Sequence, residues 1–131
     1  MTTRITGRIE TGQGVGATFI RADWALGIFR QSYDMDPFPG TLNVRVDAAC
    51  VESWQAAIAQ GQHFAAPDPS WCDARCLRAR IHFQTHEAAV VIVVPQVESY
   101  PKDQIELVAS TGLREWLEVR DGDQVILSLD F

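Results

Sequence analysis

Two side chains with neutral oxygen ligands stand two positions apart in a segment with strand-like alternation. Thr41 and Asn43 alternate with the apolar residues Leu42 and Val44, so both polar side chains point to one face of the predicted strand. Their Cα atoms would be about 6–7 Å apart, which lets the Thr41 hydroxyl and the Asn43 carbonyl meet on one hard cation. Phosphate oxygens would supply the negative charge that these ligands lack. The alternative is an edge strand whose polar face is simply solvated.

A rigid turn leads into this strand. Pro37 and Pro39 each fix φ, and Gly40 permits a left-handed conformation. The chain therefore enters the strand at Thr41 in one geometry.

A glycine-rich segment is the second candidate, and it follows a predicted first strand, Arg4 to Glu10. It consists of Gly12, Gln13, Gly14, Val15, Gly16 and Ala17. Glycines at every second position let backbone N–H groups approach an anion such as phosphate. The segment has neither the Lys-Ser/Thr ending of a P-loop nor the long following helix of a dinucleotide fold, so a flexible hairpin loop is the alternative.

Two charged residues near the C-terminus complete the candidates. Glu106 lies in a short predicted strand, Ile105 to Val108, where its carboxylate either faces solvent or meets a ligand. Arg114 lies in the first turn of a short predicted helix that Ser110 or Thr111 would cap. A guanidinium together with free backbone N–H groups suits a phosphate or a base edge.

Four further residues are spaced loosely like a zinc site, namely Cys72, Cys76, His82 and His86. The segment Leu77 to Phe83 alternates like a strand, on which residues four apart lie about 13 Å from each other. Such a stretch cannot wrap one ion, so we expect no zinc site. The three cysteines of the chain cannot all pair, and we expect them to be reduced.

The composition is that of one folded domain. The chain has 131 residues, of which 47% are hydrophobic and 21% charged, enough for one core and too short for two. Its net charge of −6 argues against a general nucleic-acid surface. No run approaches the roughly 18 apolar residues of a membrane span, and no apolar signal region follows Met1. We therefore expect a cytoplasmic protein without a nucleic-acid or membrane partner.

The remaining segments predict the elements that position these residues. Helical spacing of Val51, Trp54 and Ile58 predicts a helix over residues 48–60. Residues 77–83 and 88–94 predict a hairpin, and its second strand is apolar throughout, so it should be covered on both faces. Leu113, Trp116 and Leu117 should share the buried face of the short helix, and Val125, Leu127 and Leu129 alternate in a last strand.

Two segments predict connections without regular structure. Residues 21–36 are rich in aromatic side chains but show no clean periodicity, and residues 62–73 have the composition of a loop. About six strands and one or two short helices predict an all-β fold, a compact barrel.

Several separated segments together resemble one family, the CTP-dependent riboflavin kinases. The resemblance covers nearly the whole chain, residues 1–131, as a single domain. Its motifs are the glycine-rich segment with Phe19, the block Pro37-Phe38-Pro39-Gly40-Thr41-Leu42-Asn43-Val44, Pro95 with Tyr100 and Pro101, Ile105-Glu106-Leu107-Val108-Ala109, Leu113-Arg114 and Asp121-Gly122-Asp123-Gln124-Val125. The resemblance implies a six-stranded cradle-loop β-barrel of Greek-key type. Some members carry an N-terminal winged-helix domain, which we do not expect here.

The resemblance also implies a role for each candidate residue. Gly12 to Ala17 would hold the nucleotide phosphates, and Thr111, Gly112, Leu113 and Arg114 would hold the cytidine end. Thr41 and Asn43 would bind Mg²⁺. Glu106 would contact the flavin, as would the residue at position 98.

The reaction implied is transfer of the γ-phosphoryl group of CTP to the 5′-hydroxyl of riboflavin, giving FMN and CDP. Such a transfer demands alignment and charge neutralisation more than a strong base. Glu106 is the candidate catalytic residue, which would orient the attacking hydroxyl or accept its proton. We expect the chain to act as a monomer on these two small substrates.

Two departures from the family pattern favour other functions. Val15 stands where the family usually has a glutamate, and Glu98 replaces the usual flavin-binding threonine. Segment 70–72 differs as well, which indicates a divergent member. The alternatives are a non-catalytic barrel that binds a nucleotide or flavin, and a kinase for another small polyol or vitamin.

Overall fold

The computed structural model describes residues 2–12 and 22–130. The strands are β1 (Thr2–Glu10), β2 (Leu42–Val46), β3 (Gln62–Phe64), β4 (Ala74–Phe83), β5 (His86–Pro95), β6 (Gln104–Val108) and β7 (Gln124–Asp130). The helices are α2 (Asp23–Ser32), the 3-10 turn η1 (Ala48–Cys50), α3 (Val51–Ile58) and α4 (Leu113–Leu117). Every helix of the described ranges is too short or too polar to cross a membrane.

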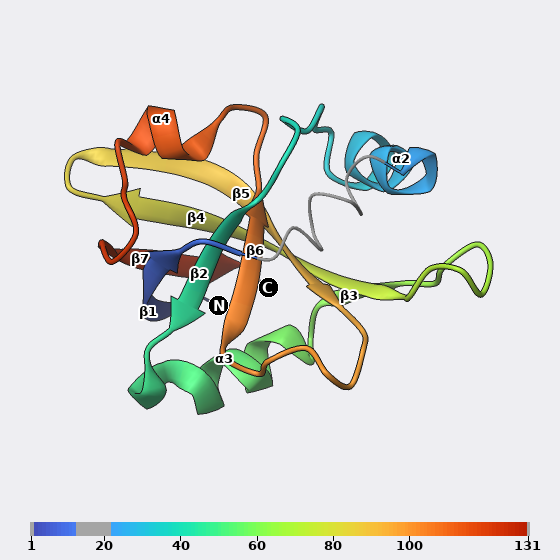
Figure 1. Ribbon diagram of the computed structural model, residues 1–131, viewed down its shortest axis with the longest axis horizontal. Coiled ribbons are helices and arrows are strands. Elements are labelled where there is room, and N and C mark those ends of the chain that lie inside the picture. Colours follow the sequence, from blue (N-terminus) through green and yellow to red (C-terminus); the bar gives the residue numbers. More distant parts are fainter. Residues whose placement is uncertain (1, 13–21, 131) are drawn as a thin grey trace.

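Six of the strands close into a barrel (Figure 1). They follow one another in the order β4, β5, β6, β2, β1 and β7, and β7 pairs back onto β4. All the pairings are antiparallel. Closure satisfies the hydrogen-bonding groups at the sheet edges. The expected six-stranded all-β barrel is therefore confirmed.

The barrel interior is filled by alternate side chains of its strands. Val125, Leu127 and Leu129 of β7 are fully buried, as their spacing predicts. Trp54 of α3 joins the same core. Figure 1 shows α3 and α4 at opposite ends of the barrel, and Leu117 of α4 is likewise fully buried in the core. The two helices thus cover the openings that the strands leave.

Strand β5 is covered on both faces, as its apolar sequence predicts. Val90 and Ile92 belong to the barrel core, whereas Val91 and Val93 belong to a second cluster outside it. Helix α2 covers this outer face with Phe29, which is fully buried.

Helix α2 corrects the prediction that residues 21–36 have no regular structure. Its buried positions are Ala25 and Phe29, one helical turn apart, followed by Tyr33 just after the helix. The pattern is weak because Ala25 is small and because Trp24 and Ile28 are only partly buried. The helix is stabilised by packing against the outside of the barrel, and its sequence lacks a wide apolar stripe.

Three smaller predictions also require correction. The predicted loop 62–73 begins with β3, which forms because it pairs with the first residues of β4. Trp116 is 54% exposed and does not share the buried face with Leu113 and Leu117. Helix α4 begins after Gly112 and has no side-chain cap, so neither Ser110 nor Thr111 caps it.

Candidate functional site

Three polar side chains form a row across β1, β2 and β6. Asn43 is the cross-strand partner of Glu10 on one side and of Glu106 on the other. Directly opposed residues share a face of the sheet, so this polar row of Glu10, Asn43 and Glu106 projects to one side. Leu42 and Val44 project to the other side, into the core. The alternation expected for the Thr41 strand is thus present.

Glu106 lies buried in the middle of a short hydrogen-bond chain. Its side chain is 2% exposed, so the interpretation of Glu106 as a solvated outward charge is wrong. The Thr41 hydroxyl donates to Glu106 Oε1 at 3.0 Å, and the Tyr100 hydroxyl donates to Oε2 at 2.8 Å. Burial, followed by the neighbouring Glu106 carboxylate, raises the pKa of Tyr100 far above its ordinary value. Tyr100 therefore remains a hydrogen-bond donor.

Asn43 is the other buried polar side chain of the described residues, with 6% exposure. Its carbonyl oxygen accepts a hydrogen bond from Gln104 Nε2 at 3.3 Å. Gly12 lies against the same carboxamide, since a Cβ atom built at Gly12 would fall closer than 3.0 Å to Asn43. Only glycine fits there without displacing Asn43.

An arginine balances the acidic charge beside the polar row. Arg45 donates two hydrogen bonds to Glu10, at 2.9 and 2.8 Å, and one to Asp103 at 2.6 Å. These hydrogen bonds, first those to Glu10, raise the pKa of Arg45.

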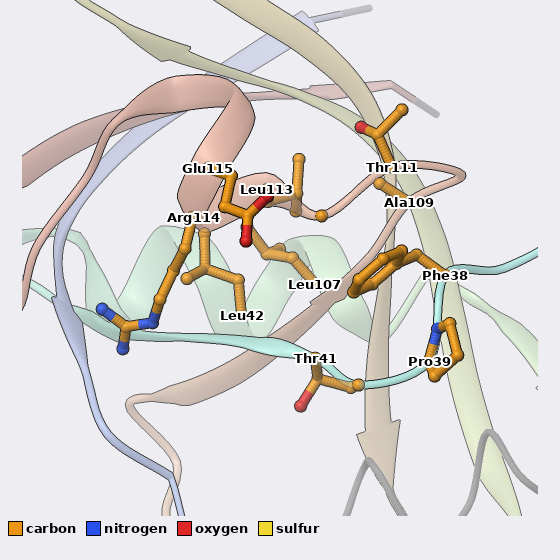
Figure 2. A pocket seen from close by; sticks show the side chains of 12 residues that line it. Phe38, Pro39, Thr41, Leu42, Leu107, Ala109, Thr111, Leu113, Arg114 and Glu115 are labelled. Carbon is orange, nitrogen blue, oxygen red and sulfur yellow. The ribbon is translucent and has the colours of Figure 1, made fainter.

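Candidate residues line two pockets, and the first of these lies between α4 and the segment that enters β2. It has a volume of about 180 Å³. Its lining includes the four predicted nucleotide-binding residues Thr111, Gly112, Leu113 and Arg114, together with Thr41. In Figure 2, Arg114 and Glu115 of α4 and Phe38 and Thr41 of the β2 entry surround it.

The turn that borders this pocket has the predicted conformation. Gly40 adopts a φ of 108°, which favours glycine. The Phe38 ring packs against Gly112, where an added Cβ would lie 3.2 Å from the ring. The β2 entry and the start of α4 are therefore in direct contact.

The second pocket has a volume of about 490 Å³ and lies beside β6 and α3. Glu98, the predicted flavin-binding residue, lines it and is exposed. Tyr100, Gln104 and Trp54 line it as well.

Sequence reasoning missed the roles of Tyr100 and Gln104. Gln104 lies two positions before Glu106 on β6, so the strand period alone places both on one face. Tyr100 carries no such signal, because a turn outside the strands brings it to Glu106.

The hydrogen-bond chain joins the two pockets. Thr41 lines the first pocket, Tyr100 lines the second, and Glu106 accepts a hydrogen bond from each. A group bound in either pocket would therefore lie one side chain away from the Glu106 carboxylate.

The predicted glycine-rich segment is described only at its first residue. Gly12 lies beside Asn43, whereas Gln13, Gly14, Val15, Gly16 and Ala17 lie outside the described residues. Arg114 donates from Nη2 to the Glu10 carbonyl oxygen at 3.3 Å and to Asp121 Oδ1 at 2.7 Å. The segment that enters the glycines thus meets α4.

Thr41 and Asn43 carry the kind of neutral oxygen that a hard cation binds. Both side chains flank Glu106, with Thr41 bonded to it and Asn43 paired with it across the strands. Magnesium prefers such oxygen ligands and keeps several waters or phosphate oxygens besides. In residues 2–12 and 22–130 no group of three or more His, Cys, Asp or Glu side chains is placed to hold a metal, so phosphates would have to supply the missing charge.

Comparison with known proteins decides the family. A sequence model of a protein family matches residues 9–129. It carries the name of CTP-dependent riboflavin kinase (CTP-dep_RFKase) and the description "Domain of unknown function DUF120". The chain belongs to the CTP-dependent riboflavin kinase domain family. The expected resemblance is thereby confirmed.

Relatives of this domain are riboflavin kinases of archaea. The chain is 32% identical to that of Methanocella arvoryzae over 124 residues, which are 95% of this chain and 56% of that protein. It is 31% identical to that of Haloquadratum walsbyi, again over 95% of this chain and 56% of the relative. The chain thus spans a little over half the length of these two relatives. The riboflavin kinase of Methanobrevibacter smithii is 28% identical and is matched over 96% of its length.

Proposed function

We propose that this member of the family is a CTP-dependent riboflavin kinase, which transfers the γ-phosphoryl group of CTP to the 5′-hydroxyl of riboflavin and releases FMN and CDP. The observation that carries the proposal is the chain from Thr41 through Glu106 to Tyr100, which connects two pockets. A kinase needs two substrate sites that meet at one reacting centre. The riboflavin kinase relatives support the same activity.

The first pocket is the proposed nucleotide site. It has a volume of about 180 Å³, and the name of the family supports CTP as the phosphoryl donor. Thr111 to Arg114 offer polar groups to the cytidine end, and the apolar side chains of Phe38 and Leu107 offer a surface for a flat ring. Gly12 to Ala17 would approach the phosphates with backbone N–H groups.

The second pocket is the proposed acceptor site. Its larger volume and the Tyr100 ring in its lining suit a flavin ring. Glu98 would lie at its exposed rim. The ribityl chain would then extend toward Glu106, which Tyr100 contacts.

The chemistry requires one new bond and one broken bond. The ribityl oxygen forms a bond to the γ-phosphorus, and the bond from that phosphorus to the β–γ bridging oxygen breaks, leaving CDP. Glu106 would orient the attacking hydroxyl or accept its proton by way of the Tyr100 hydroxyl, because Glu106 itself lines neither pocket. Because Thr41 and Tyr100 hold both of its oxygens, the carboxylate keeps one orientation while the substrates align.

Thr41 and Asn43 are the proposed residues that hold Mg²⁺. A bound Mg²⁺ would neutralise charge on the phosphate oxygens. The two side chains contribute only neutral oxygens, and Glu106 lies beside both. Gln104 holds the Asn43 carboxamide with its carbonyl oxygen fixed, which would keep that ligand in place.

One assay tests the proposal. The purified protein is incubated with Mg²⁺, riboflavin and either CTP or ATP, and FMN is measured by chromatography. We expect FMN with CTP. Glu106→Gln should lower turnover far more than nucleotide affinity, whereas Glu87→Gln, a change at an exposed carboxylate of an ion pair with Arg80, should leave both unchanged.

A second candidate is a kinase for another small polyol. Glu98 favours it, because this residue places a carboxylate in the acceptor pocket where the family usually has a neutral hydroxyl. A panel of polyol acceptors in the same assay separates the two. CTP consumption with another polyol and none with riboflavin would overturn the first proposal.

A further inference from the structure

One carboxylate outside both pockets connects the two chain segments proposed to bind the nucleotide. Asp121 Oδ2 accepts a hydrogen bond from the Thr11 hydroxyl at 2.6 Å, and Oδ1 accepts one from Arg114 Nη2 at 2.7 Å. Thr11 immediately precedes Gly12, where the glycine-rich segment begins. Asp121 itself lines neither pocket.

The backbone around Asp121 is held firmly against β1. Gly122, with a φ of 93°, allows the tight turn and donates from its N–H to the Ile9 carbonyl at 2.8 Å. The Ile9 N–H donates in return to the Asp123 carbonyl at 2.9 Å. The Arg120 N–H donates to the Asp123 side chain at 2.8 Å. The turn therefore fixes the backbone from which the Asp121 side chain projects.

The contact with Asp121 leaves most of the Arg114 guanidinium available. Only Nη2 is used, by Asp121 and the Glu10 carbonyl; within the described ranges Nε and Nη1 have no hydrogen-bond partner. Each of these two nitrogens can donate to a phosphate oxygen or to a base edge. The Arg114 side chain is 44% exposed, so without an anchor it would be free to sample several rotamers.

We propose that Asp121 is a positioning residue for nucleotide binding, which fixes the Arg114 guanidinium and the entry to the glycine-rich segment relative to each other. This inference rests on the proposed function of the first pocket. The two hydrogen bonds, first that of Thr11 and then that of Arg114, also lower the pKa of Asp121. The carboxylate therefore stays ionised at neutral pH and keeps its attraction for Arg114.

The test measures CTP affinity by calorimetry in the presence of Mg²⁺. Ordering a flexible side chain on binding weakens affinity by about two- to tenfold, so Asp121→Ala should raise the Kd for CTP by that factor. The KM for riboflavin and the kcat at saturating CTP should stay unchanged. Asp121→Asn keeps the shape and an acceptor oxygen, and it should restore part of the affinity.

A double-mutant cycle separates positioning from a general loss of stability. If Asp121 acts in part through Arg114, Asp121→Ala should weaken CTP binding less in the Arg114→Ala background than in the parent. Glu87→Ala is the matched control, because the Arg80–Glu87 pair has similar exposure, 49% and 52%, at 3.0 Å. This control should bind CTP like the parent.

The outcomes distinguish the positioning role from the kinase proposal. Equal CTP affinity of the parent and Asp121→Ala would overturn the positioning role while the kinase proposal stands. CTP binding that depends on Asp121, without any FMN formed, would support the positioning role and overturn the kinase proposal. Additive losses in the cycle, or an equal loss of riboflavin and CTP affinity with a lowered Tm, would show a structural role and overturn the inference. A parent that binds no CTP would overturn both.

Discussion

Replacing Gly12 with alanine tests the geometry around Asn43 most directly. An added methyl group would lie closer than 3.0 Å to Cγ, Oδ1 and Nδ2 of Asn43, a separation that packed atoms do not tolerate. Asn43 is 6% exposed, so its carboxamide has little room to move away. Forcing an extra methyl into such a site costs about 1–3 kcal/mol.

The Asn43 side chain should give way before the backbone does. The carboxamide is held by a hydrogen bond of 3.3 Å from Gln104, whereas the backbone just before Gly12 is fixed by the pairing of Glu10 with Asn43. A displaced carboxamide removes the proposed metal ligand from its place. We therefore expect most of this free-energy cost to appear as weaker CTP binding. The Kd of CTP in the presence of Mg²⁺ should rise by roughly 5- to 150-fold.

Calorimetry with Mg²⁺ and CTP measures the change in Kd. Urea unfolding measures how much of the cost lowers the unfolding free energy instead. Gly27→Ala is the matched control, because nothing lies within 4 Å of a Cβ built there. Alanine in place of a glycine within α2 should stabilise the protein by about 0.5–1 kcal/mol and leave CTP affinity unchanged. If Gly12→Ala bound CTP as tightly as the parent, the Asn43 carboxamide would not be required where the structure places it.

Three further predictions follow from other contacts. Tyr100→Phe should lower kcat about tenfold without weakening CTP binding, because it removes a hydrogen bond to a charged group worth roughly 1.5 kcal/mol; unchanged kcat would remove Tyr100 from the positioning of Glu106. Phe29→Ala should lower the unfolding free energy by about 3–5 kcal/mol in urea, and a smaller loss, below about 1 kcal/mol, would show that α2 contributes little to the fold. Burial raises the pKa of Cys76 from 9.0 to about 12, so its thiolate favours the unfolded state. Stability should thus be full below pH 9 and fall as the pH rises toward 12, and Cys76→Ala should make that decline shallower.

The sequence by itself determined the barrel and most of the candidate site residues. The two-residue period in Val125 to Leu129 placed alternate side chains in a core, and the unbroken apolar run of β5 required cover on both faces. These patterns are local and strong, since a strand has only two faces. The Pro37–Gly40 turn likewise specified its own geometry.

Tertiary structure alone decided what local pattern could not express. Helix α2 depends on the packing of Ala25 and Phe29 against the outer face of the barrel. The sequence has no wide apolar stripe that would predict this contact. Trp116 has helical spacing with Leu113 yet is exposed, because a helix of five residues buries only part of its circumference.

The candidate site shows the same division. Residue types and spacing identified Thr41, Asn43 and Glu106 as candidates, but whether Glu106 was solvated or buried depended on which strand lay beside it. The pairing of β2 with β6 buries Glu106 next to Asn43, and contacts across 6 and 65 positions bring Tyr100 and Thr41 to its two oxygens. The contact of Thr41 with Glu106 spans 65 positions, so no local pattern of the sequence could show it.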